Sequence, residues 1–173
     1  SWGARLAEAG AKVIYSKPGI KVHTKLLLIT AKESTIEKHY AYIGTGNFNE
    51  KTARLYCDHA LLTFDQRLTR EVAQVFRMLE TGEDYPFQHL LVAPKYLRPR
   101  FLDLIHEEIR RAKAGEEAYM VLKMNSLENR EMIDAICEAS QAGVKVQLLV
   151  RGICSLVPGV EGISEGIEAW SIL

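Results

Sequence analysis

Short apolar runs alternate along this chain with longer stretches whose apolar residues recur every three or four positions. The run at 144–150 is typical of a buried strand, whereas residues 68–79 and 98–114 have the spacing of amphipathic helices. Apolar strands that alternate with amphipathic helices need those helices to cover them, which constrains the chain to layered packing. We therefore expect an α/β fold in which mixed sheets are flanked by helices.

The same patterns place the remaining elements. Further helices are expected at residues 2–9 and 130–142, with a helical turn within 49–56. Strands are expected at 12–15, 20–29, 40–43, 60–63, 90–93, 118–123 and 144–150, and another begins near 169. The polar stretch 32–38 is interpreted as the connection of a hairpin. Asp65 or Thr69 is a candidate cap for the helix at 68–79.

Residues 81–86 are the best candidate for a linker, because glycine and proline interrupt the pattern there and a new pattern follows. We therefore expect two domains, residues 1–85 and 86–173. A short similarity between residues 6–14 and 138–146 is also in keeping with two domains. Both segments run from the end of a helix through Ala-Gly to Lys-Val in a strand. This junction is common in α/β proteins, so the similarity leaves open whether the two halves are duplicated.

Composition and charge disfavour several classes of protein. The 173 residues are 47% hydrophobic and 25% charged, which is typical of a folded protein and not of a disordered one. The net charge is zero, so a protein that coats nucleic acid is not favoured, although a local cluster of cations could still bind a polyanion. Three cysteines without CxxC spacing indicate free thiols in a reducing compartment, and we expect the cytoplasm. The histidines and cysteines show no metal-ligand spacing.

Neither end of the chain reads as the edge of a domain. The sequence starts inside a helical pattern and stops inside a strand-like one, so we expect it to be part of a longer protein. No apolar run is long enough to cross a bilayer, and no signal peptide opens the chain.

His23 and Lys25 are the first candidates for catalytic residues. They stand two residues apart at the head of an apolar run, and alternate residues of a strand point to the same face. A neutral imidazole is a nucleophile, and a neighbouring ammonium can hold the phosphate that it attacks. The alternative is a structural histidine at a strand end, which would be the better interpretation if these neighbours were absent.

The turn Gly44-Thr45-Gly46-Asn47 is a candidate binding site for an anion. Its glycines could let backbone amides approach a phosphate, while the asparagine side chain donates a further hydrogen bond. The alternative is that the glycines only permit positive φ in a turn. Lys51, Arg54 and Tyr56 follow closely, where the simpler interpretation of the charges is a solvated turn.

Arg151 directly follows the apolar run that ends at Val150. Ligand sites in open α/β sheets collect beyond the carboxyl ends of the strands, and a planar guanidinium there suits phosphate. An exposed loop arginine without a ligand is an equally good interpretation of its position.

Three segments together resemble the bacterial polyphosphate kinase family. They are Gly19–Lys25, Tyr42–Tyr56 and Val150–Gly159, and the similarity continues along essentially the whole chain. The two C-terminal domains of that family resemble halves of phospholipase D, whose signature is His-x-Lys, four residues, Asp, then a Gly-Ser/Thr-x-Asn turn. This chain matches the signature except at Thr30, which stands where the Asp would be. The resemblance implies two related phospholipase D-like domains, the second incomplete.

The resemblance also implies an activity, the reversible transfer of the terminal phosphate of ATP to polyphosphate through a phosphohistidine. His23 matches the histidine that becomes phosphorylated, and Tyr56 and Arg151 match positions that contact nucleotide and phosphate. Lys25 and the turn Gly44–Asn47 would complete the phosphate-handling side of the site. Because charge spreads over the equatorial oxygens of the transferred group, cations and amides are the donors that such a site needs.

Several expectations follow from the family pattern beyond these residues. Magnesium would accompany ATP, with its ligands upstream of Ser1, and the full-length protein would be a homo-oligomer without nucleic-acid partners. Tyr42 stands where many members have a histidine, and Gly166 stands where an asparagine is usual. The second catalytic histidine of the family is expected beyond Ile172, so we expect the 173 residues alone to be inactive.

Two other functions remain as alternatives. A phosphodiesterase of phospholipase D type would need two His-x-Lys motifs, and one is visible. A non-catalytic module that binds polyanions or oligomerises is disfavoured by the zero net charge and by the grouping of histidine, lysine and glycine.

Overall fold

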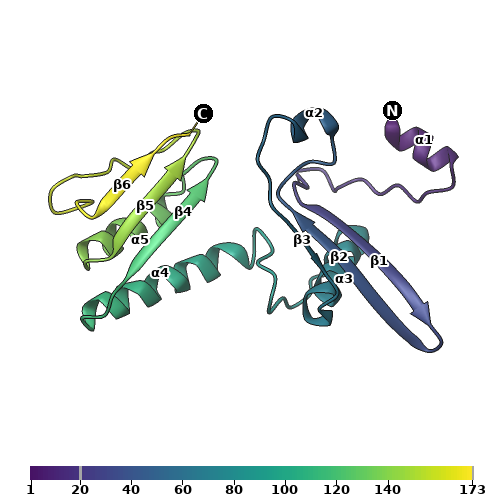
Figure 1. Cartoon of the computed structure of the whole chain (residues 1–173), viewed down its shortest axis with the longest axis horizontal. Coiled ribbons are helices and arrows are strands. Elements are labelled where there is room, and N and C mark those ends of the chain that lie inside the picture. Colours follow the sequence, from purple (N-terminus) through teal and green to yellow (C-terminus); the bar gives the residue numbers. More distant parts are fainter. Residues whose placement is uncertain (20, 173) are drawn as a thin grey trace. The chain divides into compact units, whose positions relative to one another are not determined.

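The computed structural model describes residues 1–19 and 21–172, and the chain divides into two compact units, residues 1–90 and 91–173 (Figure 1). Each unit contains a three-stranded sheet and helices, so the predicted α/β class is confirmed. The sheet of the first unit is antiparallel and that of the second is parallel.

The first unit is built around a sheet of order β1-β2-β3. Its elements are α1 (Trp2–Glu8), β1 (Lys25–Glu33), β2 (Ile36–Gly44), α2 (Glu50–Ala53), β3 (Ala60–Thr63) and α3 (Gln66–Thr81). The helix predicted at 68–79, the strand at 60–63 and the helical turn within 49–56 are all present. Because β2 is the central strand, both neighbours reach its carboxyl end at Gly44.

The hairpin of β1 and β2 is longer than predicted, and its first strand starts later. The strands run through Glu33 and Ile36, which leaves a two-residue loop in place of the expected connection at 32–38. Ser34 has a φ of 56°, the sign that tight two-residue hairpin loops require. Strand β1 begins at Lys25 and not at residue 20, which lies outside the described residues, so His23 precedes the strand.

Two predicted strands are absent from the described part of the chain. Residues 12–15 are not part of a sheet, and Ile14 instead lines a hollow beside α3. Residues 90–93 form no ladder either, because the Leu90 amide donates to the carboxylate of Glu71 and the Tyr96 amide donates to the Val92 carbonyl at 2.9 Å. An apolar run signals burial, but a strand also needs a neighbouring strand for its backbone groups.

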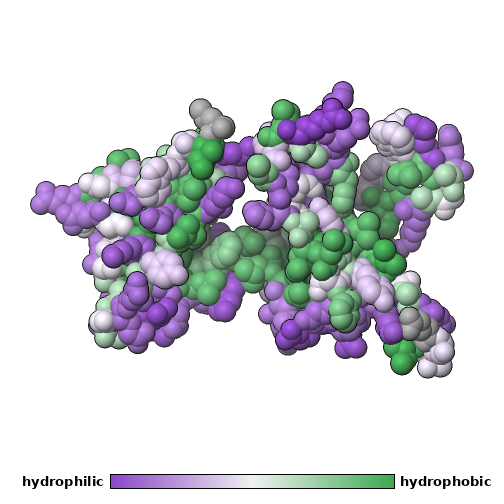
Figure 2. Space-filling view, in the orientation of Figure 1, coloured by the Kyte–Doolittle hydropathy of each residue, from purple (hydrophilic) through white to green (hydrophobic). Residues whose placement is uncertain are grey.

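Helix α3 covers one face of the first sheet. It contacts β1 and β2 and buries Val72 and Val75, and Asp65 caps it by accepting from the Arg67 amide at 2.9 Å. The other candidate cap, Thr69, is buried within the helix. The opposite face of the sheet is apolar and exposed, and hydrophobic residues gather over these strands in Figure 2. The side chains on that face include Leu27, Ile29, Tyr40, Leu62 and Phe64.

The second unit has a sheet of order β4-β5-β6, whose strands follow one another from right to left in Figure 1. Its elements are α4 (Leu97–Lys113), β4 (Tyr119–Met124), α5 (Arg130–Gln141), β5 (Lys145–Val150) and β6 (Ile167–Trp170). The helices and strands predicted for this unit beyond residue 97 are present. The last strand begins at Ile167, two residues before the expected start, and pairs in parallel with β5.

The hydrophobic core of the second unit follows from alternation along β5. Val146, Leu148 and Val150 point to the helical side and are buried against Ile136 and Ala139 of α5. The predicted arginine, Arg151, directly follows the carboxyl end of β5. Within the described residues, no helix is both long and apolar enough to cross a membrane.

Candidate functional site

The register of the first sheet brings two of the predicted segments together. Lys25, the first residue of β1, pairs with Gly44, the last residue of β2. His23 lies just before the one strand and the turn Gly44–Asn47 just after the other. Segments that are about twenty residues apart in sequence therefore meet at one edge of the sheet.

His23 and Lys25 contact each other directly. The Lys25 Nζ lies 3.0 Å from Nδ1 and 3.1 Å from Nε2 of His23, and it donates to the His23 carbonyl at 2.5 Å. Lys25 is 8% exposed, whereas His23 is exposed. Only one nitrogen of an imidazole ring can carry a free lone pair, so the ammonium can donate to at most one of the two. The pair thus places an exposed imidazole beside a buried ammonium.

Thr45 ties the turn to the segment that precedes β3. Its hydroxyl donates to Oδ1 of Asp58 at 2.9 Å and accepts from the His59 amide at 3.0 Å. Its own amide donates to the His59 carbonyl at 3.0 Å. With three hydrogen bonds on one residue, the backbone of the turn is held in place without a ligand.

The glycines of the turn are required by close packing and not by positive φ. Neither Gly44 nor Gly46 has a positive φ. A Cβ on Gly44 would collide with the ring of Tyr42, and a Cβ on Gly46 would lie 2.6 Å from Oδ2 of Asp58. The Tyr42 ring also lies 5.2 Å from that of Phe48, which follows the turn. Small residues therefore let an aromatic ring and a carboxylate approach the backbone of the turn.

The residues after the turn form the short helix α2 and lead to Tyr56. Asn49 caps α2 by accepting from the amides of Lys51 and Thr52 at 3.0 and 3.1 Å. Lys51 and Arg54 are exposed, in keeping with a solvated turn, and Asn47 is also exposed. Tyr56 is 51% exposed and lies two residues before Asp58, so it belongs to the same edge of the first unit.

Thr30, which stands where phospholipase D has an aspartate, faces a second histidine. Its hydroxyl lies 3.0 Å from Nδ1 of His39, its cross-strand neighbour on β2. Alternation along the strands puts this pair on the face opposite Lys25 and Gly44. Thr30 and His39 are therefore separate from the His23 pair.

Arg151 lies in the second unit, directly beyond β5, as the sequence predicts. Its Nε donates to Oδ1 of Asn125 at 2.6 Å, and Asn125 directly follows β4. Both residues therefore lie at the carboxyl ends of neighbouring parallel strands, the usual place for ligands in such sheets. The structure unites His23, Lys25, the turn and Tyr56 in one unit and places Arg151 in the other.

Two residues of these surroundings escaped the sequence analysis. Asp58 accepts a hydrogen bond from the Thr45 hydroxyl and lies against Gly46. Its position two residues after Tyr56 was only weak evidence that it belongs to the site. The only sequence feature that could have indicated Asn125 is that it is a polar residue directly after an apolar strand. Among the described residues, no three histidine, cysteine, aspartate or glutamate side chains group together as a metal site.

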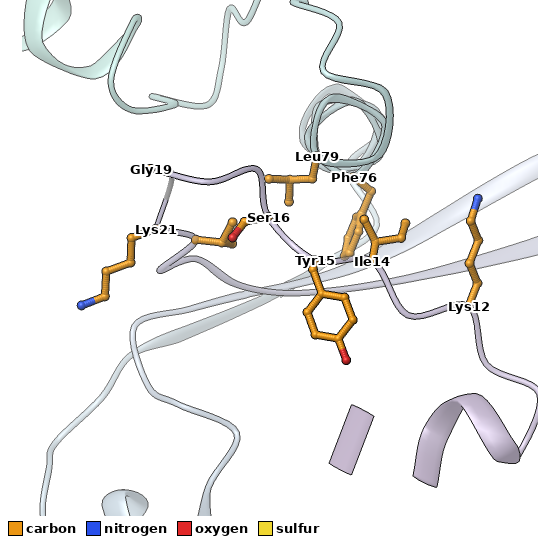
Figure 3. A pocket seen from close by; sticks show the side chains of 9 residues that line it. Lys12, Ile14, Tyr15, Ser16, Gly19, Lys21, Phe76 and Leu79 are labelled. Atoms are coloured by element: carbon orange, nitrogen blue, oxygen red, sulfur yellow. The ribbon is translucent and has the colours of Figure 1, made fainter. Parts of the chain in front are cut away.

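A hollow of about 830 Å³ in the first unit is lined in part by Lys21 and Val22, which directly precede His23 (Figure 3). Its walls come from the segment 12–19, from Lys21 and Val22, and from α3, with Ile14, Phe76 and Leu79 among the lining residues. Lys12 and Lys21 lie on opposite sides of it in Figure 3. Its apolar walls suit burial of side chains better than a phosphate.

Known proteins resemble this chain along nearly its whole length. The family model for polyphosphate kinase C-terminal domain 1 matches residues 1–85, and that for polyphosphate kinase C-terminal domain 2 matches residues 90–173. The chain belongs to the polyphosphate kinase family. The resemblance of the sequence motifs to this family is thereby confirmed.

Individual members of the family are about half identical to the chain. The polyphosphate kinase of Vibrio cholerae is 49% identical and that of Escherichia coli K12 is 48% identical, each over 99% of this chain and 25% of the relative. A crystal structure of polyphosphate kinase from Porphyromonas gingivalis matches with a TM-score of 0.85 and 38% identity, over 98% of this chain and 28% of that chain. The chain thus spans about a quarter of the length of the curated relatives that it matches.

Proposed function

We propose that this chain forms part of the catalytic region of an ATP:polyphosphate phosphotransferase, with His23 as the phosphate acceptor. The observation that carries the proposal is the contact of the buried Lys25 ammonium with both ring nitrogens of His23. The register that puts Gly44 beside Lys25 supports it, because it sets a turn suited to anions at the same edge. Membership in the polyphosphate kinase family supports the choice of substrates.

The reaction has two steps that use the same ring nitrogen. A lone pair of neutral His23 attacks the terminal phosphorus of ATP, the bond to the bridging oxygen breaks, and ADP leaves with that electron pair. A terminal oxygen of polyphosphate then attacks the phosphorus, and the N–P bond breaks to restore neutral His23. Each step is reversible, so the same site can form ATP from polyphosphate.

The other residues act on the charge of the transferred group. Lys25 stabilises the equatorial oxygens as their charge develops. The backbone amides of the turn Gly44–Asn47 serve the same purpose, apart from the Thr45 amide, which donates to the His59 carbonyl. Tyr56 offers an exposed ring to a nucleotide base, and Arg151 offers a planar guanidinium to phosphate.

In the part of the chain that the structure describes, no three histidine, cysteine, aspartate or glutamate side chains group as a metal site, and magnesium is usually held by one or two carboxylates together with substrate phosphates. We propose that it arrives as the complex with ATP, with its protein ligands elsewhere in a longer protein. The three cysteines of the chain are free thiols, which is in keeping with a reducing compartment such as the cytoplasm.

The proposal is tested by labelling the full-length protein that carries this region with γ-labelled ATP. Wild type should retain the label in an acid-labile, alkali-stable form, as a phosphohistidine does, and His23→Ala should lose it. His39→Ala is the matched control, because His39 lies in the same sheet but bonds to Thr30 on the other face. It should keep the label.

Two outcomes would count against this function, and a third would count only against the expected inactivity of the 173 residues alone. Labelling that persists in His23→Ala would exclude His23 as the acceptor. Release of a lipid headgroup without ATP would instead indicate a phosphodiesterase of phospholipase D type. ATP-dependent synthesis of polyphosphate by the isolated 173 residues would contradict our expectation that these residues alone are inactive.

A further inference from the structure

The Arg151 side chain is held by a hydrogen bond from Nε, the inner nitrogen of its guanidinium. Its Nε donates to Oδ1 of Asn125 at 2.6 Å, a short distance for an N–H···O hydrogen bond. Because the guanidinium is planar, a fixed Nε direction also fixes the plane in which the two terminal NH₂ groups lie. A side chain of this length otherwise has several rotatable bonds and would lose entropy on binding a ligand.

The backbone of Asn125 is hydrogen-bonded to the loop that follows β5. Its carbonyl accepts from the Gly152 amide at 2.8 Å, and a Cβ on Gly152 would lie 2.7 Å from that carbonyl oxygen. One step further, the Leu127 amide donates to the Ile153 carbonyl, and Leu127 pairs with Cys154 in a parallel bridge. The loops that follow β4 and β5 are therefore joined at successive residues.

We propose that Asn125 is a positioning residue, which orients the Arg151 guanidinium toward the phosphates of ATP or polyphosphate. This rests on the proposed function, in which Arg151 contacts phosphate. Asn125 acts through Arg151 and need not touch the substrate.

An amide suits this task better than a carboxylate would. The Oδ1 of Asn125 accepts from Nε but brings no charge, so it does not offset the positive charge that attracts phosphate.

The test is a double-mutant cycle on the 173-residue chain, with tripolyphosphate as the probe. Tripolyphosphate carries the three linked phosphates of ATP without the base, and calorimetry gives its Kd. Asn125→Ala should weaken binding about 3- to 10-fold, which is the size of effect expected for the loss of one ordinary hydrogen bond. In an Arg151→Ala background the same change should have no further effect, because Asn125 acts through Arg151.

Asn129→Ala is the matched control for folding. Asn129 is an asparagine of the same unit whose side chain caps α5 by accepting from the Met132 amide at 3.1 Å. Its loss should lower the thermal midpoint while leaving the Kd unchanged.

The outcomes separate this inference from the proposed function. If Arg151→Ala weakens binding but Asn125→Ala does not, the positioning role is wrong and the phosphate role of Arg151 stands. If the two changes weaken binding independently, Asn125 acts on the ligand or the fold and not through Arg151, which also overturns the inference. If Arg151→Ala has no effect, both fail.

Discussion

The residues at the edge of the first sheet show why the spacing of His23 and Lys25 predicted that they lie close together but not how they make contact. His23 and Lys25 were expected to share a strand face, whereas the strand begins at Lys25 and the contact arises because the lysine reaches back to the ring. The two-residue spacing was enough to predict proximity, but the mechanism of contact depends on where pairing with Gly44 starts.

Gly46→Ala tests the close packing of the turn. The added Cβ would lie 2.6 Å from Oδ2, 2.7 Å from Cγ and 2.9 Å from Cβ of Asp58, so the turn or the segment before β3 must move. We expect a loss of about 1–3 kcal/mol in the free energy of unfolding, as overpacking gives. Calorimetry with tripolyphosphate should also show weaker binding, because Thr45 and the turn amides move with Gly46.

The background Asp58→Ala provides the control for this residue-scale effect. It removes the carboxylate and Cγ that the new methyl group would meet, so Gly46→Ala should cost less there than in the unaltered chain. An equal cost in both backgrounds, measured by chemical denaturation, would show that Asp58 is not the obstacle.

At the scale of elements, α3 was predicted well, but the hydrogen bonds of its buried carboxylate could not be predicted from local sequence. Asp65 and the apolar stripe located the helix, because capping and periodicity are local. The buried carboxylate of Glu71, however, accepts from the backbone amides of Gln88, His89 and Leu90 and from the His89 ring. These partners are seventeen to nineteen residues away, so no local pattern reports them. The same contact explains why residues 90–93 do not form the expected strand.

Glu71→Gln should detach this segment from α3. Burial alone would raise the pKa of Glu71, but the amides of Gln88 and Leu90 and the His89 contacts outweigh it and hold the pKa below its ordinary value of 4.5. The amide variant turns an NH₂ group toward backbone donors, and we expect a loss of about 1–3 kcal/mol in unfolding free energy. Glu80→Gln, on the same helix in an exposed pair with Lys12, should cost far less.

The pH dependence of stability gives a second measurement of the same contact. Since the folded pKa lies below the unfolded one, the carboxylate stabilises the fold fully above about pH 4.5, and this contribution is lost as the pH falls through the lowered folded value. Denaturation midpoints of wild type and Glu71→Gln should therefore converge at acid pH. A constant difference across that range would mean that the charge of Glu71 is not what holds the segment.

At the scale of the whole molecule, the chain exposes more surface than its mass requires. It has 12817 Å² of accessible surface and a mass of 19.5 kDa. A compact monomer of that mass exposes about 8,500 Å², and even two separate domains of half the mass would expose about 10,300 Å². Apolar side chains such as Leu62 and Phe64, 80% and 72% exposed, account for part of the excess. The sequence pattern predicted which residues are apolar, but it could not show which faces the chain leaves uncovered.

The buried core is distributed unequally between the two units. The continuous cluster of buried apolar residues belongs entirely to the second unit, from Ile105 to Ile167. In the first unit, the buried apolar side chains among the described residues are Ala41, Val72 and Val75. Because burial of apolar surface is the main term that opposes the loss of chain entropy, the second unit should be the more stable.

Hydrogen exchange of the intact chain tests this difference in a single sample. The backbone amides of β4, β5 and α5 should exchange about tenfold or more slowly than those of β1 and β2, which corresponds to a gap of about 1.4 kcal/mol or more between the opening free energies of the units. β2 is the decisive strand, because it is paired on both sides and would be the last to exchange in its sheet. Fast exchange in β2 would therefore report opening of the whole first unit, since fraying of an edge strand would leave β2 paired. Protection of β2 equal to that of β5, which is also paired on both sides, would show that the uncovered sheet is as stable as the covered one and that the unequal core does not decide the order of unfolding.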